Sequence, residues 1–163
     1  IIDSKLSPEM NVIRIAQEKA MDVSKKEKGV ILSADTIVVI QNNVLGKPKD
    51  EKDAIRMLKL LSGHIHHVIT AFTIFDTETK NKLTQSVISK IKMRSLNISM
   101  IEAYVTSEKP LDKAGAYGFQ ELGDTFIESI EGSYTNVVGL PMEAVIPALE
   151  KFGVSIVCSI ERV

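Results

Sequence analysis

The sequence predicts an α/β domain, because segments with helical spacing alternate with runs of β-branched and other apolar residues. The chain has 163 residues, which is about one domain and enough to bury a core. No Pro/Gly/Ser-rich linker, low-complexity tract or internal repeat divides it. We therefore interpret residues 1–163 as a single domain.

Capping residues mark the starts of the predicted helices. Ser7 precedes a proline at the first helical position, which is a favourable helix start. Asp50 opens a second helix that Gly63 ends, and Ser99 forms a capping box with Glu102. The predicted helices cover residues 8–23, 50–61, 99–106 and 140–153.

Strands are predicted where β-branched and apolar residues are dense. The run 30–40 is the clearest of these, and the polar pair Asp35-Thr36 interrupts it. The segments 109–124 and 132–141 are interpreted as loops. The predicted strands cover residues 30–40, 67–75, 85–94, 125–130 and 154–160.

The charge balance argues against nucleic acid and membrane surfaces as partners. Twenty basic residues oppose 21 acidic ones, so a bound polyanion must be held by a local group of lysines. Cys158 is the only cysteine, which excludes a disulfide framework within the chain and fits the reducing cytoplasm. No apolar stretch approaches the ~18 residues that span a bilayer. A homodimer remains open.

Asp35 is the first candidate for chemistry. It places one carboxylate inside an otherwise apolar strand, and burying a charge is costly unless the charge is paired or bound to a metal. Residues at strand ends in α/β sheets line the ligand crevice, which favours a functional role. The alternative is a carboxylate that caps a helix or forms a salt bridge with a lysine. These residues alone do not decide between the two.

Two further groups are weaker candidates. Lys47 lies between Gly46 and Pro48, on a short stiff segment from which a lysine can reach a phosphate. A solvated surface lysine is the alternative there. The tract 64–67 contains all three histidines, yet no Cys or Glu lies nearby at ligand spacing, so a structural metal at this tract is disfavoured.

The segment 112–120 has the densest concentration of functional groups. It combines Asp112 and Lys113 with two glycines, an aromatic ring and the amide of Gln120. Glycines let the backbone approach a ligand closely, and an amide that both donates and accepts suits the edge of a base. The alternative is an Ω-type loop that packs on its own tyrosine. A second such loop, 132–141, leads to a helix N-terminus, where anions are favoured.

Several ordered motifs give the sequence a resemblance to a known family. They are a helix with Ala16, Lys19 and Ala20, then Ala34-Asp35-Thr36-Ile37-Val38, Leu45-Gly46-Lys47-Pro48, Leu60-Leu61-Ser62-Gly63 with His66 and Thr70, the run from Asp112 to Gln120, and Gly132-Ser133-Tyr134 with Asn136-Val137-Val138-Gly139-Leu140-Pro141. Any one of these would be weak alone. Together and in this order, they make the chain similar to the Maf family of nucleotide pyrophosphatases over roughly residues 15–153.

The resemblance implies an α/β fold shared with inosine triphosphatases, with a mixed twisted sheet, flanking helices and two lobes around a nucleotide cleft. It also implies hydrolysis of nucleoside triphosphates to the monophosphate and pyrophosphate with a divalent metal, Mg²⁺ or Mn²⁺. Asp35 takes the place of the catalytic acid/base and is the candidate metal ligand. The substrate-facing positions are Lys19, Thr36, Lys47, Asp112, Lys113, Gln120 and Ser133.

Two of these positions concern the choice of base. Thr36 and Gln120 match the positions that mark the family branch preferring dTTP and UTP. The Gln120 amide can donate to an exocyclic oxygen and accept from a ring N–H, as uracil and thymine require. We therefore expect dTTP and UTP to be better substrates than ATP, GTP or 7-methyl-GTP.

One family feature is missing from the sequence. Maf proteins open with a strand and a Ser-x-Ser-Pro-Arg-Arg loop whose arginines hold the triphosphate, and no such segment precedes Ile1. An acidic residue that the family carries shortly before the Ser7 helix is missing too. We expect the biological protein to be longer. The alternatives to an active pyrophosphatase are a catalytically weak nucleotide-binding regulator of cell division and a different phosphatase on the same fold.

Overall fold

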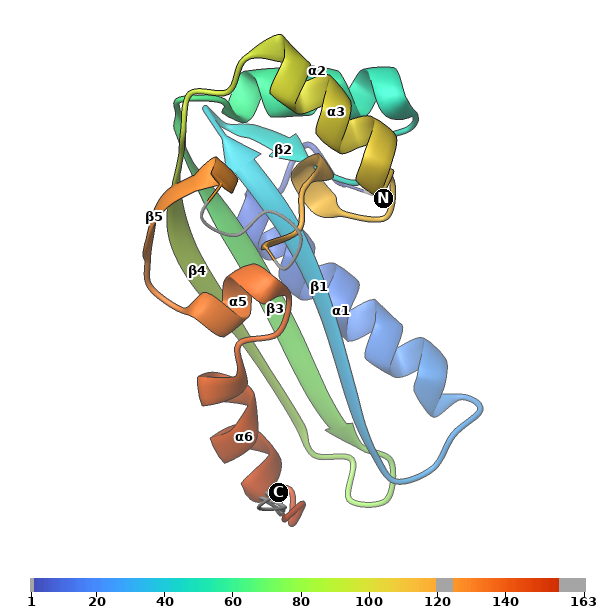
Figure 1. The fold of residues 1–163 in the computed structure, drawn as a ribbon. Coiled ribbons are helices and arrows are strands. Elements are labelled where there is room, and N and C mark those ends of the chain that lie inside the picture. The colour runs from blue at the N-terminus through green and yellow to red at the C-terminus, as the bar shows by residue number, and fades with distance from the viewer. Residues whose placement is uncertain (1, 120–124, 156–163) are drawn as a thin grey trace, which may run out of the picture.

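Helices are interspersed with strands along the part of the chain that the computed structural model describes, residues 2–119 and 125–155 (Figure 1). The strands are β1 (Val30–Ile40), β2 (Asn43–Leu45), β3 (Ile65–Asp76), β4 (Lys82–Met93) and β5 (Ile127–Glu131). The helices are α1 (Pro8–Ser24), α2 (Glu51–Leu61), α3 (Ile98–Glu108), the 3-10 turn η1 (Ala114–Ala116), α5 (Tyr134–Val138) and α6 (Met142–Glu150). The predicted α/β class is confirmed.

The five strands form one sheet in the order β2-β1-β3-β4-β5. Strand β3 pairs with β1 on one side and with β4 on the other over nearly its whole length. The pairings among the described strands are all antiparallel, so the mixed character predicted for the sheet is not seen in this part of the chain. The β1–β3–β4 meander is the frame on which the other elements are placed.

The outer edge of β1 is only partly paired. Strand β2 pairs with Val38 to Ile40, and residues 30–37 have no strand on that side within the described ranges. At this open edge no neighbouring strand covers the backbone of β1 within the described ranges, so a ligand can approach it there. Because successive side chains of a strand point to opposite faces, Asp35 and Thr36 leave this edge in opposite directions.

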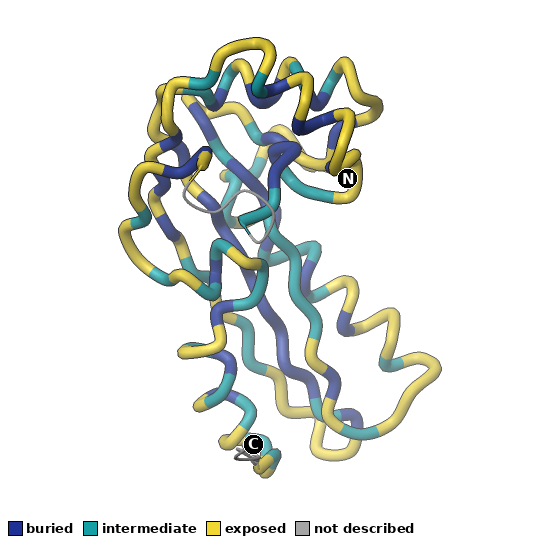
Figure 2. Tube along the Cα trace, viewed as in Figure 1, coloured by how far each residue is buried: buried dark blue, intermediate teal, exposed yellow. Residues whose placement is uncertain are grey.

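Helices cover both faces of the sheet (Figure 1). On one face Val12 and Ala16 of α1 pack on Ile37, and on the other Val145 of α6 packs on Phe72. Helices α2 and α3 lie across one end of the sheet. Figure 2 shows the consequence, with buried residues concentrated along the central strands and exposed residues along the outer sides of the helices.

Most predicted boundaries are confirmed, and the caps explain them. The Ser7 hydroxyl accepts a hydrogen bond from the Met10 N–H at 3.2 Å, which starts α1. The Asp50 carboxylate accepts one from the Asp53 N–H at 2.8 Å, which starts α2. Strand β1 has the predicted bounds.

The predicted start of α3 was wrong. Asn97, not Ser99, is the N-cap, and its side chain accepts a hydrogen bond from the Met100 N–H at 2.9 Å. The capping box that begins at Ser99 therefore lies inside the helix. An asparagine is as good an N-cap as a serine, and the earlier of two competing caps sets the start here.

The segment predicted as a loop over 132–141 contains the short helix α5. The Ser133 hydroxyl caps it by accepting a hydrogen bond from the Asn136 N–H at 2.9 Å. A helix of five residues is too short to show a helical period in the sequence. The predicted last strand, 154–160 with Cys158, lies mostly outside the described residues. No helix in the described ranges is long and apolar enough to cross a membrane.

Gly115 allows η1 to pack directly on β1. Its φ is +70°, a region that disfavours side chains. A Cβ placed on Gly115 would lie 3.0 to 3.3 Å from three side-chain carbons of Val38, which is buried in the core. Gly46, by contrast, has no atom within 4 Å of such a Cβ and no positive φ.

We predict that Gly115→Ala lowers the free energy of unfolding by about 2 kcal/mol or more, through backbone strain and overpacking on Val38. The matched variant Gly46→Ala should change it by less than about 1 kcal/mol, since it meets neither obstacle. Urea unfolding of both variants, compared at equal m-values, measures the difference. Equal stability of the two variants would show that η1 does not depend on this close approach.

Candidate active site

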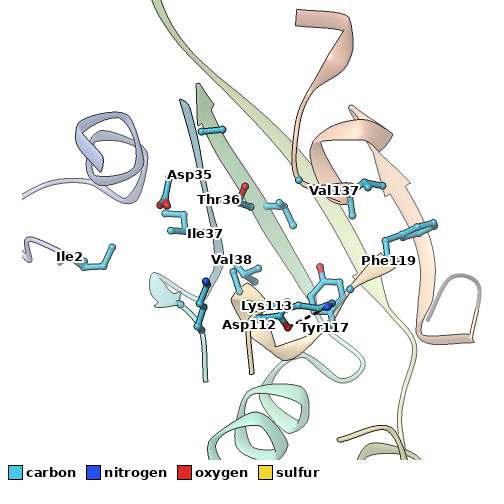
Figure 3. Close-up of a pocket in the computed structure, with 18 of the residues that line it drawn as sticks. Ile2, Asp35, Thr36, Ile37, Val38, Asp112, Lys113, Tyr117, Phe119 and Val137 are labelled. Atoms are coloured by element: carbon cyan, nitrogen blue, oxygen red, sulfur yellow. Dashed lines mark hydrogen bonds and ion pairs between the residues drawn. The ribbon is translucent and has the colours of Figure 1, made fainter. Parts of the chain in front are cut away.

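A cavity of about 630 Å³ lies against the open edge of β1 and brings together six of the eight predicted site residues (Figure 3). Its volume is in the range of small-molecule and cofactor sites. Helix α1, the turn between β2 and α2, the η1 region and α5 supply the other walls. The predicted residues that line it are Lys19, Asp35, Thr36, Lys47, Asp112 and Lys113.

Asp35 forms an ion pair inside this cavity. The Lys19 ammonium of α1 lies 2.6 Å from Asp35 Oδ1 and also donates to the Ala34 carbonyl at 3.0 Å. The carboxylate is 20% exposed and the lysine side chain 50% exposed, so solvent screens the pair. The salt bridge with a lysine, one of the two interpretations of Asp35 from the sequence, is therefore confirmed. Asp35 also lines a ligand-sized cavity, and its role in chemistry stays a prediction.

Thr36 points the other way from the same strand (Figure 3). Its hydroxyl lies 2.9 Å from the hydroxyl of Thr70, its register partner on β3, and Thr70 is fully buried. The pair fixes the Thr36 hydroxyl on the face of the sheet that η1 and α5 cover. Asp35 and Thr36 are adjacent in sequence and point to opposite faces of the sheet, yet both line the same cavity. The cavity reaches both because the outer edge of β1 is open at these residues.

Lys47 is held by its backbone neighbours. The Gly46 carbonyl accepts a hydrogen bond from the Gly115 N–H at 3.0 Å, which ties the segment before α2 to η1. The following helix starts three residues later, at the Asp50 cap. Lys47 therefore sits on a short segment fixed at both ends, as predicted, with its side chain on the cavity.

Asp112 and Lys113 lie at the rim of the cavity. Lys113 Nζ is 3.3 Å from Asp112 Oδ1, and the carboxylate is 74% exposed. A hydrogen bond from Lys113 holds the pKa of the Asp112 carboxyl below its usual value, and the charge of Lys47 adds a smaller effect in the same direction. The two lysines therefore act on the same region of the cavity. Among the described residues, three lysines and two aspartates line it. A site of this kind favours an anionic ligand.

A buried pair anchors the wall between η1 and the sheet. The hydroxyl of Tyr117, which lines the cavity, lies 2.6 Å from His66 Nε2 of β3, and the two rings meet edge to face at 5.5 Å. Burial lowers the pKa of His66 to about 4 and raises that of Tyr117, so both are neutral near pH 7. His66 is thus turned into the core, where it holds Tyr117 in place.

Asn136 anchors α5 against the sheet. Its fully buried side chain donates to the Val68 carbonyl at 3.1 Å and to the Ser89 hydroxyl at 2.9 Å. These bonds fix the helix whose Val137 lines the cavity. Ser133 does not line the cavity, and its hydroxyl is used in capping α5. A direct contact between Ser133 and the substrate stays a prediction.

Sequence reasoning missed the two anchors and could not place one predicted residue. The Tyr117–His66 bond joins residues 51 positions apart, and Asn136 contacts strands 47 and 68 positions away, so no local pattern reveals either. The only indication in the sequence was that His66, Tyr117 and Asn136 belong to the family motifs. Gln120, the predicted reader of the base, lies outside the described residues.

Comparison with known proteins identifies the family of the chain. The family model described as Maf-like protein matches residues 2–152. A dTTP/UTP pyrophosphatase of Acetivibrio thermocellus is 46% identical over 153 residues, which cover 89% of this chain and 76% of the relative. One from Syntrophomonas wolfei is 48% identical over 144 residues, covering 88% and 76%, and one from Thermosipho africanus is 46% identical over 143 residues, covering 87% and 72%. The predicted resemblance is confirmed, and the chain belongs to the Maf family.

Proposed function

We propose that this chain hydrolyses nucleoside triphosphates, dTTP and UTP above all, to the nucleoside monophosphate and pyrophosphate. The observation that carries the proposal is the cavity, which joins a carboxylate and three lysines to an apolar wall around the open edge of β1. The names of the relatives, dTTP/UTP pyrophosphatase, agree with the activity predicted from the motifs. The expected location is the cytoplasm.

The lysines are suited to receive a triphosphate. In the free protein Lys19 is paired with Asp35 and Lys113 with Asp112. Ion pairs exposed to this extent stabilise a protein by about 0–1 kcal/mol, so a triphosphate can share or replace them at little cost. Together with Lys47, these ammonium groups would neutralise the charge that grows on departing pyrophosphate.

Asp35 is the residue that we assign to the attacking water. Hydrolysis between the α and β phosphates needs a water in line with the leaving pyrophosphate and a group that orients or deprotonates it. Asp35 offers a carboxylate that lines the cavity, with Lys19 bonded to one of its oxygens. Lys19 thereby holds the Asp35 carboxylate in position, and the carboxylate accepts a hydrogen bond or a proton from the water.

A divalent cation fits this site when it arrives with the substrate. Among the described residues, Asp35 and Asp112 are the carboxylates that line the cavity, and no group of three His, Cys, Asp or Glu side chains there could hold a metal ion by itself. Mg²⁺ is commonly held by one or two carboxylates together with substrate phosphates, and Mn²⁺ accepts the same oxygen ligands. Asp35 is the residue that would hold it. Such a cation would offset the negative charge of the phosphates.

We predict that Asp35→Asn lowers turnover of UTP by about 10²–10⁴-fold, the range for losing a general base. The fold should survive, because the substitution keeps the shape of the side chain and the lost pair is screened. Asp22→Asn is the matched control. Asp22 pairs with Lys25 at the same 2.6 Å but does not line the cavity, so turnover should not change.

Steady-state assays of released pyrophosphate, with thermal melts for stability, compare the two variants. Turnover near the wild-type value in folded Asp35→Asn would remove Asp35 from the mechanism. Binding of UTP without any turnover in the wild type would support the nucleotide-binding regulator instead.

We predict that kcat/KM is higher for UTP and dTTP than for ATP, GTP or 7-methyl-GTP, and that Thr36→Val narrows this preference. A site that hydrogen-bonds a base discriminates against bases that leave its polar groups unpaired. Gln120→Glu should narrow the preference too. Thr73→Val is the control, because Thr73 makes the same kind of hydroxyl pair, with Thr84 at 3.0 Å, away from the cavity. A wild-type preference for a purine would overturn the assignment of the base.

A further inference from the structure

The cavity lining is divided into a charged part and an apolar part. The lysines and aspartates come from α1, β1, the segment before α2 and the start of the η1 region. Apolar side chains of β1 line the cavity between the two parts. The apolar part away from the charges is formed by Val68 of β3, Phe119, and Val137 and Val138 of α5. Figure 3 shows Phe119 and Val137 on the opposite side of the cavity from Asp35. A ligand that fills the cavity therefore has an anionic end and an apolar or aromatic end.

Phe119 is the aromatic ring best placed for that second end. It lines the cavity, it is partly buried, and it packs against the main core cluster. Tyr117, the other aromatic residue on the cavity, is almost fully buried and its hydroxyl is committed to His66. Phe119 thus has ring surface for a ligand, whereas Tyr117 is part of the wall.

Tyr134 fixes the orientation of the Phe119 ring from outside the cavity. The two rings meet edge to face, with centroids 4.9 Å apart and planes at 82°. Tyr134 is the first residue of α5, and it does not line the cavity. The helix that carries it is capped by Ser133 and bonded to β3 through Asn136. An edge-to-face contact of this geometry is favourable and directional, so it restricts the plane of Phe119.

We propose that Phe119 is the stacking platform for the base of the nucleotide and that Tyr134 is its positioning residue. The proposal rests on the proposed function for the nature of the ligand. Stacking on an aromatic ring tolerates every base, because each base has a π-face. Phe119 therefore contributes affinity for the base, while the hydrogen bonds near Thr36 contribute the choice between bases.

Titration calorimetry with two ligands separates the two ends of the cavity. UMP carries the base with one phosphate, and tripolyphosphate carries the charged end alone. Phe119→Leu keeps an apolar side chain and removes the π-face. We expect it to weaken UMP binding about 5- to 150-fold, the range for one stacked base, and to leave tripolyphosphate binding within about twofold. Tyr134→Leu should weaken UMP binding by a smaller factor.

Two further variants test for a general loss of structure and for coupling between the two rings. Phe152→Leu is the matched control, since Phe152 is also partly buried but packs near α6 and does not line the cavity. It should leave both affinities unchanged. The double variant Phe119→Leu/Tyr134→Leu should bind UMP no more weakly than Phe119→Leu alone, because Tyr134 acts through Phe119.

The outcomes distinguish this proposal from the proposed function. Unchanged UMP affinity in Phe119→Leu, or equal weakening of UMP and tripolyphosphate, overturns the platform even where the wild type cleaves UTP. Selective weakening of UMP supports the platform even where the wild type binds nucleotides without cleaving them. For UTP turnover, a platform role predicts a raised KM with kcat changed less than about threefold, because stacking is made equally in the ground and transition states.

Discussion

The pairing of β1 with β3 is the constraint on which the site depends. It fixes Asp35 opposite Ala71 and Thr36 opposite Thr70, so two adjacent residues present their side chains to opposite faces. If β1 were paired on both sides at these residues, the sheet would separate the two side chains, and one cavity could not reach both. Strand β2 stops short of them, however, and one cavity reaches around the open edge to both. A single ligand can therefore reach the Asp35 carboxylate on one face and the Thr36 hydroxyl on the other.

The remaining walls are fixed by a few long-range contacts to this strand pair. Gly115 lets η1 touch Val38, and the Tyr117–His66 bond ties the following residues to β3. Asn136 does the same for α5. The charged groups sit on segments with more exposure, where lysines and carboxylates can exchange partners when an anion binds. The walls of the cavity are thus fixed by buried contacts to the sheet, whereas its charged side chains lie on more exposed segments.

The sequence predicted what local patterns encode. Capping at Ser7 and Asp50 and the run of β1 residues gave correct boundaries, whereas the competing caps at Asn97 and Ser99 misplaced the start of α3. Family motifs supplied most of the residues on the cavity, including Lys19, which no local pattern near Asp35 suggests. The opposite directions of Asp35 and Thr36 follow from strand alternation. The contacts that join distant segments, such as Phe119 with Tyr134, depend on tertiary packing and were not predictable from local pattern.

In the proposed reaction, water attacks the α-phosphorus of a nucleotide that lies across the β1 edge, and pyrophosphate leaves. Hydrolysis of UTP in water enriched in oxygen-18, followed by phosphorus NMR of the products, tests it directly, because the isotope shifts the resonance of the phosphorus that was attacked. Attack at the α-phosphorus puts oxygen-18 in UMP and none in the pyrophosphate, and this is the result that we predict. Label in the pyrophosphate, or inorganic phosphate as the first product, would contradict it.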